Sequence, residues 1–317
     1  MTELRAEQLD TPPEPVPSTA PRRLTGQRLR AWSGRYLEAY ALLLLTIAVA
    51  IFFGVWSKTS GTFLTSANIQ VLLGTQTVVA VVALGALVPL IAGEWDLSVG
   101  AVAGLSAVSV AQLMSHGNSV VVALLGGLGI GLAVGLLNAL ITTRLRVNAV
   151  ITTLGVATII AGIVNQRTHG LAVVSNIPAA VTNFGTGTWF GLPRTVFAVA
   201  LIAGVIYYLF EYTPFGRYLY ALGSNPSAAT LVGIRVRFVL ASSFVLAGVL
   251  SAAGGFLQVA RSGGADPNVG TGLTLPALAA AFLSAASIKP GKFNVGGTIV
   301  ALLFLAVLNS GLNLAGA

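Results

Sequence analysis

Two long stretches of the sequence, residues 59–93 and residues 97–143, contain no charged residue. Over the whole chain of 317 residues, 8% of residues are charged and 55% are hydrophobic, whereas about a quarter of the residues of a soluble domain are charged. Such a chain cannot cover itself with a polar surface in water, so the lipid bilayer is the solvent that it fits. The absence of cysteine excludes thiolate metal sites, thiol nucleophiles and disulfides.

Apolar runs long enough to cross a bilayer recur along the chain. A membrane-spanning helix needs about 20 mainly apolar residues. The pattern predicts an all-α polytopic membrane helical bundle with about nine or ten transmembrane helices. Its spans are expected at residues 37–56, 70–91, 97–115, 119–142, 148–165, 195–212, 238–259, 274–288 and 296–315. The 274–288 span is short and begins near Pro276, which favours a broken or tilted helix.

The basic residues indicate the orientation of the chain. With the N-terminus in the cytoplasm and alternating spans, only Lys58, Arg167, Arg194 and Arg261 of the 17 Lys and Arg residues lie outside. Basic residues collect on the cytoplasmic side of membrane proteins. We therefore expect a multi-pass protein of the plasma (inner) membrane with a cytoplasmic N-terminus, and interpret the net charge of +8 as a topology signal, not as a sign of nucleic-acid binding.

The first residues differ in composition from the rest. Residues 1–35 are rich in proline and arginine and nearly free of large apolar side chains. Such a segment cannot bury enough apolar surface to offset the entropy lost on ordering. The sequence therefore predicts a disordered cytoplasmic tail over 1–35 and a transmembrane domain over 36–317.

Glycines recur every fourth residue in the fourth predicted span, at Gly127, Gly131 and Gly135. Residues four apart share one face of a helix, and glycines there let a neighbouring backbone approach closely. We expect this face to pack tightly, with a hinge as the alternative.

Two segments share a pattern of Asp, two residues and Val-Gly: "DLSVG" at 96–100 and "DPNVG" at 266–270. The predicted topology puts Asp96 on the cytoplasmic side and Asp266 on the outer side. Similar units on opposite faces suggest an inverted-topology repeat, a common plan in transporters, although so short a match also arises by chance. A true repeat would pair spans two to five with spans seven to ten. The nine predicted spans include all of these except the tenth.

Two carboxylates, Glu94 and Asp96, interrupt the charge-free region. In a structural interpretation, Asp96 or Ser98 caps the third span near water, where a side-chain oxygen accepts from free N–H groups. In a functional interpretation, a carboxylate binds a coupling ion or a proton, because acidic residues within membranes are costly. The capping role is favoured and the ion-binding role stays open.

The loop 213–237 is predicted to face the cytoplasm and to contain a short helix. Asn225 followed by Pro226 is a favourable pair for an N-cap and a first turn, and Gly233 ends the helix. The helix is uncharged and lies between Arg217 and Arg235. We expect it to dock into a groove on a partner.

Polar residues within the spans have two interpretations. Most such residues form hydrogen bonds between helices, and some line a pathway for a neutral polar solute. The candidates for a pathway are Asn138, Thr152, Thr153, Asn165 and Asn309. The two histidines, His116 and His169, lack metal-ligand spacing, so no metal site is predicted. The chain also lacks a phosphate-binding Gly-x-x-x-x-Gly-Lys-Ser/Thr loop, so nucleotide hydrolysis would require another chain.

Four segments resemble a known family. They are similar to segments of the permease subunits of ribose-, xylose- and galactose-type ABC importers. The segments are "GEWDLSVGAVAGLSAV" (93–108), "GLLNALITTRLRVNAVITTLGVATIIAGI" (135–163), "FGRYLYALGSNPSAATLVGI" (215–234) and "GLNLAGA" (311–317). The resemblance runs in register from Asn68 to Ala317. It departs at Glu94 and Trp95, where the family has a small and an aliphatic residue, and the family commonly continues into one more helix.

The resemblance implies a permease with a fold like that of type II importers. It also implies that the permease works as a homodimer. A cytoplasmic ABC ATPase would bind ATP and magnesium, so this chain would bind no cofactor itself, and an extracytoplasmic solute-binding protein would deliver the substrate. The signature residues Asp96, Leu97, Ser98 and Gly100 would stabilise the inner end of the third span. The residues that would contact the ATPase are Gly223, Ser224, Asn225, Pro226, Ser227, Ala228, Ala229, Leu231 and Gly233.

The sequence therefore favours a non-enzymatic transport subunit of an importer for a monosaccharide or a related neutral polyol. One alternative is an ion-coupled secondary transporter that uses Asp96 or Glu94. The other is a membrane scaffold that transports nothing.

Overall fold

The computed structural model describes the backbone of residues 25–316 and the side chains of residues 38–316. Most of the predicted tail, residues 1–24, lies outside the described residues. Helix α1 (Thr25–Val55) begins within the segment predicted to be a tail. Every proline of that segment precedes Thr25, and proline is the residue that disfavours a helix interior most strongly. The bundle belongs to the compact unit Glu38–Ala317.

Long apolar helices account for all nine predicted spans within the described residues. They are α1, α2 (Ser66–Ile91), α3 (Val99–Ser115), α4 (Val120–Thr143), α5 (Ala149–Thr168), α7 (Arg194–Tyr212), α10 (Val236–Ser262), α11 (Val269–Leu283) and α12 (Val295–Ala315). Eight of these helices are long and apolar enough to cross a membrane, α11 only together with the turn that continues it to Ala286, and α3 is an apolar helix of 17 residues. The prediction of a polytopic helical bundle is confirmed.

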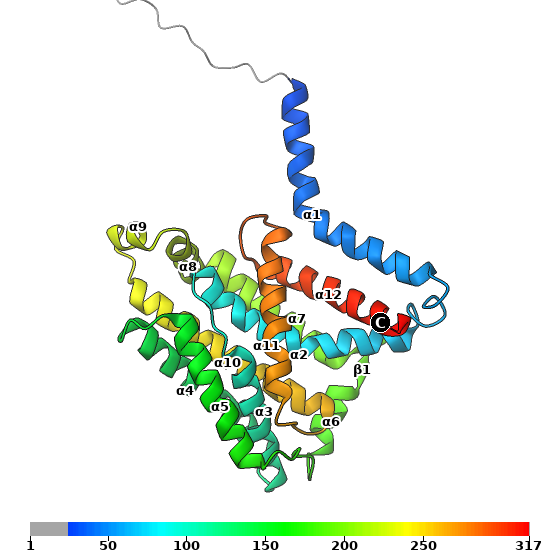
Figure 1. Ribbon diagram of the computed structural model, residues 1–317, viewed down its shortest axis with the longest axis vertical. Helices are drawn as coiled ribbons and strands as arrows, with labels where there is room; N and C mark the ends of the chain where they lie inside the picture. Colours follow the sequence, from blue (N-terminus) through cyan, green and yellow to red (C-terminus); the bar gives the residue numbers. More distant parts are fainter. Residues whose placement is uncertain (1–24, 317) are drawn as a thin grey trace, which may run out of the picture. The chain divides into compact units, whose positions relative to one another are not determined.

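Short elements connect the long helices. Between α5 and α7 lie α6 (Ala179–Thr186) and a hairpin of β1 (Thr188–Trp189) and β2 (Leu192–Pro193), which pair antiparallel. Between α7 and α10 lie α8 (Pro214–Ser224) and α9 (Pro226–Leu231), and a 3-10 turn, η1 (Ser284–Ala286), follows α11. Figure 1 shows α8 and α9 at one end of the bundle and α6 at the other. We call these the α9 end and the α6 end.

Helices α4 and α10 pack with their backbones in direct contact. A Cβ atom added to Gly131 would collide with the carbonyl oxygen of Gly248, and one added to Gly248 would collide with that of Gly131. At Gly135 the nearest atom would be the Phe244 carbonyl oxygen, 2.7 Å away. The predicted close packing of this glycine face is confirmed.

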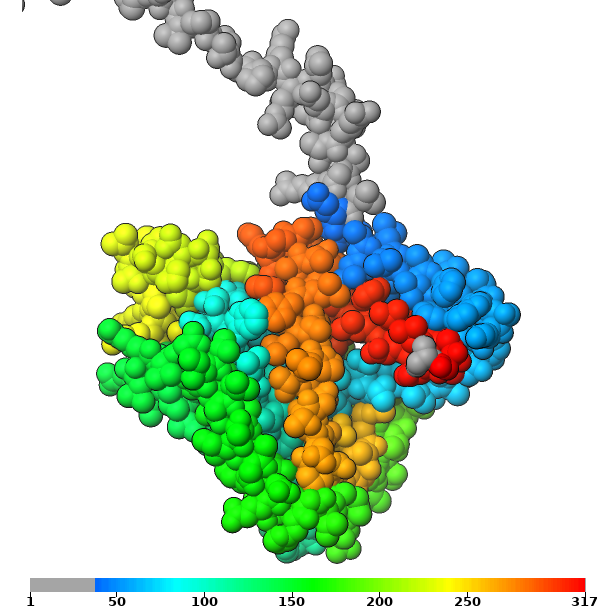
Figure 2. All heavy atoms as spheres, in the orientation of Figure 1, coloured from blue at the N-terminus to red at the C-terminus, as the bar shows by residue number. Residues whose placement is uncertain are grey.

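The predicted boundaries of the eighth span were wrong. Helix α11 begins at Val269 instead of residue 274, and Pro276 lies inside it. The helix continues through Pro276 although proline lacks the N–H that would have bonded to the carbonyl of Gly272. Figure 2 shows α11 at the surface, in orange, between α5 in green and α12 in red.

The two Asp-x-x-Val-Gly segments have the same local structure. Asp96 Oδ1 accepts from the Ser98 N–H at 2.8 Å, and Asp266 Oδ1 accepts from the Asn268 N–H at 2.7 Å. Helices α3 and α11 begin at the next residue, valine in each case. The first turns of the two helices also meet, since a Cβ at Gly100 would contact Gly270. The wider repeat of four spans stays a prediction.

Candidate functional site

The segment 92–98 joins α2 to α3 and carries the two carboxylates. Gly93 has a φ of +89°, a conformation that suits glycine, and the Glu94 N–H donates to the Pro89 carbonyl at 2.9 Å. This tight turn lies at the end of α2 and directs the chain back toward the bundle. Trp95 packs edge-on against Phe282 of α11, with 4.8 Å between ring centroids.

Asp96 is held by a hydrogen-bonded chain that reaches a third helix. Its Oδ1 accepts from the hydroxyl of Ser98 at 2.5 Å, and the Ser98 hydroxyl accepts from Asn138 Nδ2 of α4 at 2.9 Å. The backbone N–H of Leu97 donates to Thr153 Oγ1 of α5 at 3.0 Å. The signature segment therefore ties the start of α3 to α4 and to α5.

The expectation that Asp96 lies near water was wrong. Its side chain is 1% exposed, because α4 and α5 cover the turn. Burial raises the pKa of Asp96, and the two hydrogen bonds from Ser98 oppose that rise. Of the two proposed capping residues, Asp96 is the one whose side chain accepts, since Ser98 makes no side-chain capping bond. Glu94 is only half-buried, and burial alone raises its pKa.

The predicted short helix is present as α9. Asn225 Oδ1 accepts from the Ala228 N–H at 3.0 Å, Pro226 occupies the first turn, and Gly233 follows with a φ of +82°. Leu231 is 88% exposed and Val232 is 76% exposed. The expected coupling segment therefore forms a capped helix whose C-terminal end exposes apolar side chains, while Ala229 is buried against the rest of the chain.

Helix α8 precedes α9 and was not predicted as a separate element. A sequence signal for it exists, because Thr213 and Pro214 occupy the N-cap and first-turn positions as Asn225 and Pro226 do, although the Thr213 side chain makes no capping bond. Its C-terminal end is fixed to the bundle, since a Cβ at Gly223 would collide with the Ile91 carbonyl of α2.

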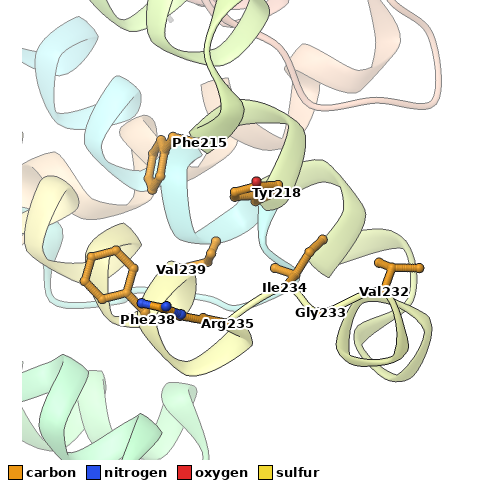
Figure 3. Close-up of a pocket in the computed structure, with 8 residues that line it drawn as sticks. All are labelled: Phe215, Tyr218, Val232, Gly233, Ile234, Arg235, Phe238 and Val239. Atoms are coloured by element: carbon orange, nitrogen blue, oxygen red, sulfur yellow. The ribbon is translucent and has the colours of Figure 1, made fainter.

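A groove of about 420 Å³ lies between α8 and the start of α10. Figure 3 shows Phe215 and Tyr218 of α8 on one side of the groove and Arg235 and Phe238 on the other, with Val239 between them. The groove is mostly apolar and carries one cationic side chain. It adjoins α9, so the two features form one continuous surface at this end of the bundle.

The loop between α11 and α12 links this surface to the rest of the bundle. Tyr220 of α8 donates its hydroxyl to the Phe293 carbonyl at 2.8 Å, and Lys289 pairs with Glu211 of α7 at 2.5 Å. Burial, and to a smaller extent the charge of Glu211, raise the pKa of Tyr220 to about 12.

Asn294 holds this loop in shape and was missed by the sequence reasoning. Its Nδ2 donates to the carbonyls of Ser284, Ser287 and Lys292, and its Oδ1 accepts from the Gly297 N–H at 2.7 Å. An asparagine directly before an apolar run is an N-cap signal, so the capping role was readable from the sequence. The bonds from Asn294 to the three carbonyls could not be predicted from the sequence.

The candidate pathway residues do not form one set. Asn138, Thr152 and Thr153 are buried inside the chain, whereas Asn165 and Asn309 are exposed. Thr153 and Asn138 bond to the signature segment. Asn138 Oδ1 and Thr152 Oγ1 are buried and lack a partner among the described residues. A role in solute passage stays a prediction for all five.

The described residues contain no group of three or more His, Cys, Asp or Glu side chains that could hold a metal ion.

The bundle of long apolar helices defines a polytopic membrane protein. Residues 68–317 match the family described as branched-chain amino acid transport system / permease component, and the chain belongs to this family. The ribose import permease protein RbsC of Escherichia coli is 32% identical over 293 residues, which cover 90% of this chain and 88% of RbsC. RbsC of Bacillus subtilis is 34% identical over 280 residues, covering 87% and 84%.

A relative named for another sugar is also similar. The L-arabinose ABC transporter permease protein AraH of Azospirillum brasilense is 29% identical over 304 residues, covering 96% of this chain and 87% of AraH. No solved structure matches the chain. The chain is thus a multi-pass permease component of the ABC importer type, and these relatives favour that function over ion-coupled secondary transport.

Proposed function

We propose that this chain forms the transmembrane pathway of an ATP-driven importer for a monosaccharide or a related neutral polyol. The observation that carries the proposal is the similarity to ribose and arabinose permeases over about nine-tenths of the chain. The solute class agrees with a bundle in which candidate polar groups carry no fixed charge. Neutral hydroxyls and amides bind a sugar without the desolvation cost of an ion.

The α9 end faces the cytoplasm in this proposal. The connections at that end carry Arg144, Arg146, Arg217, Arg235, Arg237, Lys289 and Lys292, whereas the α6 end carries Lys58, Arg167, Arg194 and Arg261. The excess of basic residues at the α9 end supports this orientation.

A separate ABC ATPase docks on α9 and hydrolyses ATP with magnesium. A short helix with exposed leucine and valine at its end fits into an apolar groove of a partner. Movement of α9 reaches the bundle through α8, whose Tyr220 hydroxyl bonds to the loop before α12. The α11–α12 loop then passes the displacement to α7 through the pair of Lys289 and Glu211.

A second copy of the chain and a solute-binding protein complete the importer. Helices α5 and α11 expose Ile151, Ile159 and Leu275, and a Cβ at Gly155 or Gly162 would meet nothing within 4 Å. Small residues on an uncovered face allow the backbone of another helix to approach, which supports a homodimer through this face. The solute-binding protein docks at the α6 end.

Reconstitution into vesicles tests the proposal. The chain is combined with a candidate ABC ATPase and a candidate solute-binding protein from the same organism, and uptake of labelled ribose and arabinose is measured. We expect uptake of at least one sugar only when both partners and ATP are present. Uptake by the chain alone under a proton or sodium gradient would overturn the proposal.

A matched pair of variants tests the docking of the ATPase. Leu231→Glu adds a charge to an exposed side chain of α9, and Leu171→Glu makes the same change at a side chain that is 71% exposed at the α6 end. We expect Leu231→Glu to lose co-purification with the ATPase and Leu171→Glu to retain it. Equal retention by both variants would contradict docking on α9.

A further inference from the structure

The tip of the β1–β2 hairpin has an unusual composition for its backbone. Phe190 and Gly191 occupy the turn with φ values of +51° and +78°. Two-residue turns with positive φ at both positions favour Asn-Gly or Asp-Gly, because a bulky side chain is strained there. The Phe190 side chain is 98% exposed, so no contact with a described residue offsets the strain.

The hairpin is nevertheless held in place. Gln70 of α2 donates from Nε2 to the Gly191 carbonyl at 3.1 Å. The Arg194 N–H donates to the Gly187 carbonyl at 2.9 Å, and the Arg194 guanidinium lies 5.6 Å from the centre of the Trp189 ring. An exposed aromatic side chain on a fixed turn indicates a surface that something outside the chain covers.

The hairpin continues the exposed face of α7. Trp189 packs on Phe197 with 5.6 Å between ring centroids. Steps of three or four residues along α7 from Phe197 lead to Leu201, Val205, Tyr208 and Tyr212, which are all exposed large apolar or aromatic side chains. Residues at these spacings share one face of a helix, so Trp189 extends a single apolar stripe beyond the start of α7.

The length of the stripe matches a bilayer. Helix α7 has 19 residues, which span about 28 Å at 1.5 Å per residue, close to the roughly 30 Å of the hydrocarbon core. Tyr207, Tyr208 and Tyr212 cluster at the far end of α7, with Tyr208 stacked on Tyr212 at 5.6 Å. Aromatic side chains at both ends of a span are typical of the two membrane interfaces.

We propose that the β1–β2 hairpin inserts Trp189 and Phe190 into the lipid headgroup region and anchors α7 at the α6 end. The interface suits this turn, because Phe190 gains an apolar environment there while Arg194 lies beside lipid phosphates. The alternative occupant, a solute-binding protein, would have to sit on the side of the hairpin that continues the lipid-facing stripe.

Spin labels on introduced cysteines test the anchor, and the lack of native cysteine leaves no background labelling. A label at exposed Thr188 leaves both aromatic side chains in place. Labels at exposed Leu201 and Ser60 serve as the lipid and water references. In vesicles, we expect the ratio of oxygen to nickel-chelate collision rates at Thr188 to fall between the ratios at Leu201 and Ser60. A ratio equal to that at Ser60 would overturn the proposal.

Two further arms of the experiment distinguish the occupants. Phe190→Asn, which suits positive φ and removes the ring, should lower the ratio at Thr188 toward that at Ser60 and leave the ratio at Leu201 unchanged. No change at Thr188 would count against the anchor. Adding the solute-binding protein should leave both collision rates at Thr188 unchanged, whereas a fall in both rates would assign the hairpin to that protein instead.

Discussion

The N-cap of α9 provides a direct test of how the chain is coupled to its ATPase. The helix has six residues, and Asn225 Oδ1 accepts the Ala228 N–H at its start. Pro226 has no N–H, so this bond satisfies one of the few free donors of the first turn. Asn225→Ala removes the bond and leaves the exposed side chains of α9 unchanged.

The expected loss follows from the size of one capping bond. Replacing an N-cap asparagine by alanine costs about 1 kcal/mol, which lowers the local folding equilibrium of α9 roughly fivefold. Isolated helices shorter than about 12 residues are marginal, so α9 has little stability in reserve. Asn225→Ser keeps a capping oxygen and is the matched control.

Hydrogen exchange and ATPase binding give the two readouts. We expect the amides of residues 228–231 to exchange about five times faster in Asn225→Ala than in Asn225→Ser, with a parallel loss of affinity for the ATPase. Faster exchange with unchanged ATPase affinity and uptake would refute the argument that an ordered α9 transmits the movement. Unchanged exchange would refute the capping argument itself.

Three other changes test the packing of the bundle. Asp96→Ala leaves the Ser98 donors without their acceptor in a buried site and should lower the free energy of unfolding by about 2–3 kcal/mol. The loss is measured as a lower thermal midpoint and loss of assembly, and Glu94→Gln should stay near the wild type. Gly131→Leu should destabilise by at least about 1–3 kcal/mol through overpacking or prevent folding, while Gly129→Leu, where a Cβ meets nothing within 4 Å, should be tolerated. Asn294→Ala should cost about 3 kcal/mol and reduce ATP-driven uptake, and wild-type stability in this variant would contradict its role in shaping the loop.

The features that the sequence predicted correctly have local causes. Hydropathy places the nine long helices because each is apolar along its length, whether its side chains face lipid or, as in α3, other helices. The spacing of Gly127, Gly131 and Gly135 fixed one packing face, since residues four apart share a side of the helix. Asn225 and Pro226 predicted the start of α9 because a cap acts only on the next few residues.

The features that were missed depend on partners distant in sequence. The burial of Asp96 requires Asn138 and Thr153, which lie on helices that follow it by dozens of residues, so a charge near the end of an apolar run looked solvated. Pro276 looked like a helix start, but α11 begins earlier, at Val269, where Gly270 packs against Gly100 of α3. The strained hairpin at Phe190 contradicts the residue preferences of its turn, so no residue pattern predicted it.

The mutual contact of Gly131 and Gly248 also limits how the bundle can move. Each helix presents a carbonyl oxygen to the space where the other would carry a Cβ, so a rotation or a sliding step of α4 against α10 would drive neighbouring side chains into the facing backbone. These two helices form a fixed frame for the other spans. Helix α5 packs mainly on α3 and α4 rather than on α10. A rearrangement of the bundle would therefore move the other helices around this pair.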